Sequence, residues 1–120
     1  MEIESEKIDD VLKVKPLEKR IDASISADFR GRMREWISEG NRRIVLDLSA
    51  VEFVDSSGLG AVASSLKAVK DRDGLVISGI RGAVEDLFHL TRMDRVFRIF
   101  ESAADAVDFF RKNRGEKGGT

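Results

Sequence analysis

The segment Ile44-Val45-Leu46-Asp47-Leu48 is a short apolar run in which hydrophobic and polar residues do not alternate. Strands that face solvent on one side alternate the two kinds of residue, whereas strands covered by helices on both faces are apolar almost throughout. Leu75-Val76-Ile77-Ser78 has the same character. We therefore expect both segments to be buried strands, with residues 44–48 forming the central strand of a sheet.

The segments before and after these strands have helical periodicity, because mainly apolar residues recur every three to four positions and so lie along one face of a helix. Gly40 and Gly74 are expected to end the first two helices, and Ser102 to cap the last one. The buried faces of the four predicted helices contain Phe29, Met33, Trp36 and Ile37; Leu59, Val62, Ala63, Leu66 and Val69; Val84, Leu87, Phe88 and Thr91; and Ala103, Ala106, Val107 and Phe110.

Further strands are expected near both ends of the chain. Residues 3–8 and 11–17 have the pattern of a hairpin, and residues 97–100 that of a short strand. Pro16 cannot donate a hydrogen bond to a neighbouring strand, so it should lie at a strand end or a sheet edge. Strands that alternate with helices predict the α/β class, here with a mixed, largely parallel sheet of four to five strands and about four helices.

The composition suits one domain without a nucleic-acid or membrane surface. Of the 120 residues, 42% are hydrophobic, and the 21 basic and 22 acidic residues are spread along the chain. We place the domain at residues 1–111 and expect the polar, glycine-rich residues 112–120 to be a flexible tail. The start of the chain is unlike a signal peptide, and no segment approaches the ~18 apolar residues of a membrane span. The cytoplasm is the expected location.

The residue types that catalysis and metal binding require are scarce. The chain has no cysteine, and His89 is its single histidine, so neither a disulfide nor a zinc or iron site is expected. No acid–base pair or activated nucleophile can be recognised. We therefore expect a protein that is not an enzyme and uses no cofactor. Asp47 and His89 are expected to have structural roles, Asp47 through hydrogen bonds.

The loop Asp55-Ser56-Ser57-Gly58-Leu59-Gly60 joins a strand-like segment to the second predicted helix. In α/β folds, functional groups gather in loops that leave the carboxyl ends of strands. The simplest explanation of Ser57 is that it caps the helix, because a serine at this place can accept a hydrogen bond from a free amide of the first turn.

Two known motifs fit this loop poorly. Gly58, Gly60 and Ala63 match the G-x-G-x-x-A pattern of dinucleotide-binding units, but Ser78-Gly79 stand where an acidic residue is expected ~20 positions later. A serine hydrolase needs glycines two residues to either side of its nucleophile, and Ser57 has none there. Neither a nucleotide-binding site nor a hydrolase is favoured.

The segments Arg43–Ser49 and Val54–Gly60 together resemble the anti-sigma factor antagonist family, whose fold is the STAS domain, and the resemblance covers roughly residues 8–110. It implies that Ser57 is phosphorylated by a partner anti-sigma factor with ATP-dependent serine kinase activity, with Ser56 as the alternative acceptor. It also implies that a serine phosphatase removes the phosphate, and that the unphosphorylated form binds the anti-sigma factor and frees a sigma factor for transcription.

We expect a partner-binding surface around these serines. Each member has a structural alternative, because polar residues of the first loop could cap the first helix and apolar residues of the second helix could belong to the core. Lys19-Arg20 stand where the resembled family usually has a glycine, which adds positive charge beside this surface. The expected members are Asp22 and Ser24 in the first loop, Asp55 and Ser56 beside the acceptor, and Gly58, Leu59 and Val62 at the start of the second helix.

A second hypothesis for the function stays open at this point. STAS domains also occur in signalling and lipid-transport assemblies, where this chain would be a constitutive adaptor subunit. In that case Ser57 would only cap a helix and would never be modified.

Overall fold

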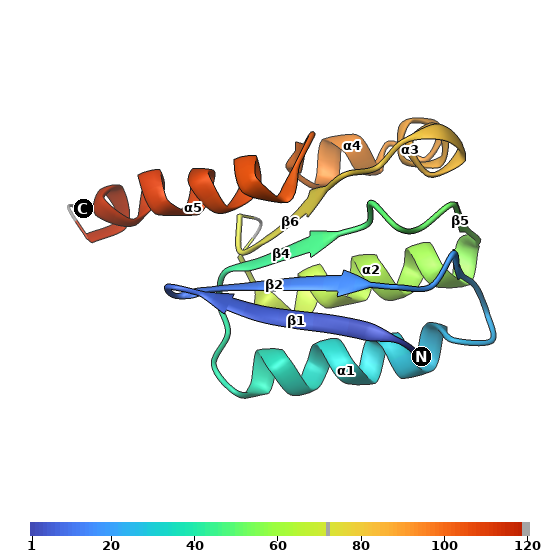
Figure 1. The fold of residues 1–120 in the computed structure, drawn as a ribbon, viewed down its shortest axis with the longest axis horizontal. Helices are drawn as coiled ribbons and strands as arrows, with labels where there is room; N and C mark the ends of the chain where they lie inside the picture. The colour runs from blue at the N-terminus through green and yellow to red at the C-terminus, as the bar shows by residue number, and fades with distance from the viewer. Residues whose placement is uncertain (72, 119–120) are drawn as a thin grey trace.

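The computed structural model of the protein describes residues 1–71 and 73–118. Its strands form a sheet that lies between helices (Figure 1). The elements follow one another along the chain as β1 (Ile3–Ile8), β2 (Val11–Pro16), β3 (Arg20–Ile21), α1 (Ser26–Ser38), β4 (Ile44–Asp47), β5 (Phe53–Val54), α2 (Ser56–Val69), β6 (Leu75–Ser78), α3 (Gly82–Leu90), α4 (Met93–Val96), β7 (Ile99–Phe100) and α5 (Ala103–Gly118).

The main sheet of the described residues has five strands in the order β1-β2-β4-β6-β7, with β4 at its centre. β1 is antiparallel to β2, whereas the other neighbouring strands are parallel. The predicted α/β class, the N-terminal hairpin and the central position of residues 44–48 are therefore confirmed. Pro16 is the last residue of β2, as expected of a residue that cannot donate a ladder hydrogen bond.

The surroundings of β4 explain why this strand is apolar on both faces. Ile44 and Leu46 belong to a core that α1 and α2 cover, and Val45 belongs to a second core under α5. Figure 1 shows α1 and α2 on one side of the sheet and α5 on the other. Asp47 is also buried, and its Oδ1 accepts a hydrogen bond from the Ser49 N–H at 3.0 Å. The structural role expected for this carboxylate is therefore confirmed.

β3 and β5 form a separate parallel pair, in which Arg20 lies opposite Phe53 and Ile21 lies opposite Val54. Neither β3 nor α4 is predicted from the sequence, because elements this short show no periodicity. The pair nevertheless matters for function, since β3 and β5 end just before α1 and α2. It brings the two loops that begin these helices side by side.

Two helix ends agree with the sequence-based expectations. Gly40 follows the end of α1 with a φ of +100°, a conformation that glycine adopts without strain. At the start of α5, the Ser102 Oγ accepts a hydrogen bond from the Asp105 N–H at 3.1 Å. The predicted stop and the predicted cap are therefore confirmed.

Two other ends differ from expectation. α2 ends at Val69, and Lys70 takes the left-handed conformation that closes the helix, so the prediction that Gly74 ends it is wrong. α5 continues to Gly118, so helical structure extends into the segment expected to be a tail. The flexibility of that tail stays a prediction, and residues 119–120 lie outside the described part of the chain.

Candidate functional site

Asp55 occupies the N-cap position of α2 and connects this helix to the loop before α1. Its backbone is extended, and its Oδ1 accepts a hydrogen bond from the Gly58 N–H at 2.9 Å. Its second oxygen, Oδ2, accepts a hydrogen bond from the Ala23 N–H at 3.0 Å. One carboxylate therefore caps α2 and also holds together the loops that follow β3 and β5.

Gly58 allows the first turn of α2 to approach β3 closely. A Cβ atom at this position would lie 2.1 Å from the backbone oxygen of Ile21, far inside van der Waals contact. The same oxygen accepts a hydrogen bond from the Asp55 N–H at 3.3 Å. Packing against the β3 backbone is therefore sufficient reason for a glycine here, and Gly58 itself is buried.

Ser56 and Ser57 begin α2, and both are exposed. Within the described residues neither hydroxyl makes a hydrogen bond. The helix cap that Ser57 could have provided is supplied by Asp55, so the capping explanation of Ser57 is wrong. The sequence could not distinguish the two, because Asp and Ser are both good N-cap residues. The arrangement leaves an accessible hydroxyl at the positive end of a helix dipole.

Asp22 and Ser24 form a small hydrogen-bonded turn beside the serine loop. The Asp22 Oδ1 accepts hydrogen bonds from the Ser24 Oγ–H at 2.5 Å and the Ser24 N–H at 3.0 Å. The hydroxyl of Ser24, assisted by the Arg20 guanidinium, holds the pKa of the Asp22 carboxyl below its ordinary value. The N-cap residue of α1 is Ile25, and among the described residues its side chain makes no capping hydrogen bond, so the structural alternative that Asp22 or Ser24 caps this helix is wrong.

Arg20 and Phe53 form an exposed contact at the edge of the site. The guanidinium carbon of Arg20 lies 4.2 Å from the centre of the Phe53 ring, and the Arg20 Nε lies 3.7 Å from the Asp22 Oδ2. Phe53 is 37% exposed despite its size. Arg20 therefore covers an aromatic ring beside Asp22. This contact is not predictable from the sequence, since it depends on the pairing of β3 with β5.

Three further candidates from the sequence lie elsewhere. Leu59 and Val62 are buried in the core under the sheet, so the structural alternative holds for both side chains. His89 lies on the surface of α3, where its Nδ1 is 2.8 Å from the Asp94 Oδ2. These residues can affect the site only by fixing the position of α2 or of the helices beyond it.

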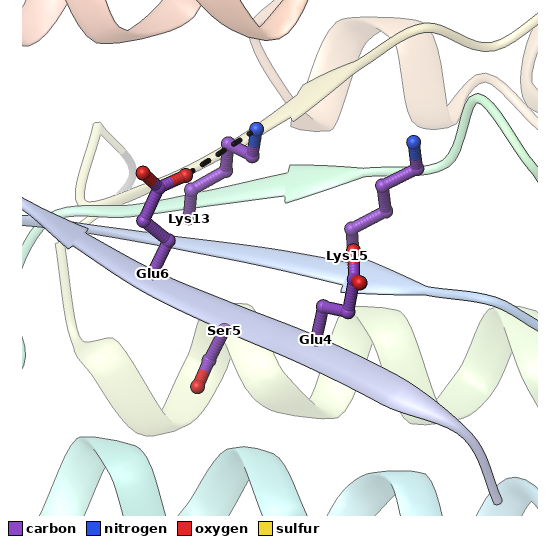
Figure 2. A pocket seen from close by; sticks show the side chains of 5 residues that line it. All are labelled: Glu4, Ser5, Glu6, Lys13 and Lys15. Carbon is purple, nitrogen blue, oxygen red and sulfur yellow. Dashed lines mark ion pairs between the residues drawn. The ribbon is translucent and has the colours of Figure 1, made fainter.

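The surface also has a hollow of about 330 Å³ on the β1–β2 hairpin (Figure 2). Glu4 lies opposite Lys15 and Glu6 lies opposite Lys13 in the antiparallel ladder. The Lys13 Nζ is 3.7 Å from the Glu6 Oε1, and Figure 2 shows Ser5 pointing to the other face of the sheet. Opposite charges face one another across the strands, which is an ordinary way to stabilise an exposed hairpin.

Neither a metal centre nor a membrane span is found in the part of the chain that the structure describes. No three of its His, Asp and Glu side chains are grouped so that they could hold a metal ion. None of its helices is both long enough and apolar enough to cross a membrane.

Comparison with known proteins gives consistent matches. The family model of the STAS domain matches residues 2–106. The anti-sigma-F factor antagonist RsfB of Mycobacterium tuberculosis is 30% identical over 96 residues, which cover 78% of this chain and 77% of RsfB.

Solved structures are similar over almost the whole chain. The crystal structure of an anti-sigma factor antagonist from Mycobacterium paratuberculosis has a TM-score of 0.82 and 26% identity, covering 92% of this chain and 95% of that one. The crystal structure of the Thermotoga maritima protein TM1081 has a TM-score of 0.83 and 25% identity, covering 91% and 94% of the two chains.

The close approach of α2 to β3 predicts opposite effects of alanine at two glycines of one helix. We expect Gly58→Ala to lower the free energy of unfolding by about 1–3 kcal/mol or more, because its Cβ would collide with the backbone of Ile21. Gly60→Ala is the matched control, since a Cβ there has no atom within 4 Å, and it should raise stability by up to about 1 kcal/mol. Urea denaturation measures both values. Equal effects of the two substitutions would contradict the packing described.

Proposed function

The chain belongs to the STAS domain family, and from this premise we propose that it is an anti-sigma factor antagonist controlled by phosphorylation of Ser57. In this proposal the unphosphorylated protein binds, in the cytoplasm, an anti-sigma factor that has serine kinase activity. Binding releases a sigma factor for transcription. Phosphorylation of Ser57 by the same partner ends the binding, and a serine phosphatase restores it.

The observation that carries the proposal is the division of roles between Asp55 and Ser57. Asp55 caps α2, so the Ser57 hydroxyl is exposed and has no hydrogen bond within the described residues. A phosphate adds about 1.5 to 2 negative charges and three acceptor oxygens. The amides and dipole at the start of α2 favour a negative charge at this place. The fold should therefore accept the phosphate without losing its cap.

Partner binding should be far more sensitive than folding. Asp22 and Ser24 lie in the loop that the Asp55 carboxylate holds against the start of α2, where Ser56 lies, so all three form one surface with Ser57 in this proposal. A partner packed on that surface would have to remove water from a phosphate dianion, which is costly without new counter-charges. The proposed surface therefore binds a partner only while the serine is unmodified.

The buried members of the expected surface have an indirect role in this proposal. Gly58 fixes the approach of α2 to β3, and Leu59 and Val62 anchor the first turns of the helix in the core. Substitution of these residues should change partner binding through the position of the serine loop. Direct contact with the partner is left to the exposed polar residues.

Phosphate mapping tests the modification. After incubation with the partner anti-sigma factor kinase and ATP, we expect mass spectrometry to find one phosphate, on the peptide that contains Ser57. Ser57→Ala should abolish incorporation, and Ser56→Ala should retain it, because the neighbouring serine then still offers its hydroxyl. A phosphate on neither serine would contradict the proposal and would favour a constitutive adaptor.

Charge at position 57 should weaken binding without unfolding the protein. We expect Ser57→Asp to bind the anti-sigma factor about tenfold or more weakly than Ser57→Asn, which has the same size and no charge. Calorimetric titration measures the affinities, and thermal unfolding should give similar midpoints for both variants. Equal affinities of the two variants would rule out an electrostatic switch.

A further inference from the structure

Arg30 in α1 has a buried polar atom without a partner. Within the described residues its Nε is shielded from water and makes no hydrogen bond, and the arginine takes part in no ion pair. Buried polar atoms normally have hydrogen-bond partners, and an exception calls for an explanation. An arginine held in this state is suited to an anion that is present only part of the time.

The position of Arg30 on α1 directs it toward α2. Phe29 and Met33 face the core, and Arg32 lies on one flank, where its Nη2 donates to the Met1 oxygen at 3.5 Å beside β1. Each residue along a helix turns by about 100°. Arg30 therefore lies on the opposite flank, which faces the neighbouring helix α2 (Figure 1).

Ser57 lies on the facing flank of α2. Both helices connect parallel strands of one sheet, so they run side by side in the same direction on its lower face (Figure 1). Arg30 follows the buried Phe29, whereas Ser57 precedes the buried Gly58. Relative to these buried residues, Arg30 is turned by about 100° in one sense around α1, and Ser57 by about 100° in the opposite sense around α2. The two side chains are therefore turned toward each other.

The first turns of the two helices also lie at a similar height. The hydrogen bond from the Ala23 N–H to Asp55 brings the start of α1 level with the start of α2. Side chains of a helix point back toward its N-terminus, so Arg30 extends from the second turn of α1 toward the first. Ala27, one turn earlier on the same flank, is small and exposed.

We propose that Arg30 is the counter-ion of phosphorylated Ser57 and holds the phosphate at the start of α2. The inference rests on the proposed function. The acidic groups facing the phosphate are Asp55 and Asp22, whose carboxylates already accept backbone hydrogen bonds. Arg34 lies one turn further along the same flank as Arg30 and adds positive charge. In the phosphorylated protein the Arg30 side chain turns toward the phosphate, so its guanidinium offsets repulsion from the two carboxylates and its Nε gains a partner.

The ionisation of the phosphate tests this inference without a kinase. Phosphoserine can be placed at position 57 by genetic encoding, and phosphorus NMR then gives its second pKa, which is near 6 when unperturbed. We expect Arg30→Gln to raise this pKa by about 0.5–1 unit, because a positive neighbour favours the dianion. Arg32→Gln removes the same charge from the opposite flank and should leave the pKa nearly unchanged. Arg30→Lys should retain part of the effect.

A second readout needs no substitution at Arg30. The nitrogen NMR signal of the Arg30 Nε–H in the phosphorylated parent should move with the same midpoint as the phosphate. Equal phosphate pKa values in Arg30→Gln and Arg32→Gln, or an Nε–H signal that ignores the phosphate, would overturn the inference. Failure of the kinase to modify Ser57 would instead contradict the proposed function and would leave these two measurements intact.

Discussion

The carboxylate of Asp55 is the contact on which the serine loop depends. One oxygen caps α2 through the Gly58 N–H, and the other holds the Ala23 N–H of the loop before α1. The two contacts join segments that are far apart in the sequence but follow the paired strands β3 and β5. Because Asp55 satisfies the helix end, the neighbouring Ser57 has no structural task and keeps an exposed hydroxyl.

The rest of the fold gives this contact a rigid frame. β4 is buried between two cores, and α2 is anchored by side chains such as Leu59 and Val62. Gly58 sets α2 directly against the backbone of β3, where no larger residue fits. A change of charge at Ser57 therefore acts on a surface that is already fixed. A fixed surface of this kind suits the proposed function, in which a charge on Ser57 controls the binding of a partner.

Segments with a clear hydrophobic pattern were predictable from the sequence. Very short strands, and contacts that depend on tertiary packing, were not. The unbroken apolar run at residues 44–48 identified the central strand, because burial on both faces leaves a clear pattern. The two-residue strand β3 leaves none. The choice of Asp55 over Ser57 as the cap depends on backbone geometry, since both residue types suit that position. The partnerless Nε of Arg30, seen among the described residues, depends on how this side chain packs in the folded chain, which the sequence pattern does not reveal.

Amide hydrogen exchange at Gly58 and Ala23 tests the central claim most directly. The two amides report the two hydrogen bonds of the Asp55 carboxylate, and exchange can be measured with and without a phosphate on Ser57. If Asp55 holds the loop independently of the serine, both amides will keep their protection after phosphorylation. Loss of protection at both amides would show that the phosphate displaces Asp55, and it would contradict this account of the site.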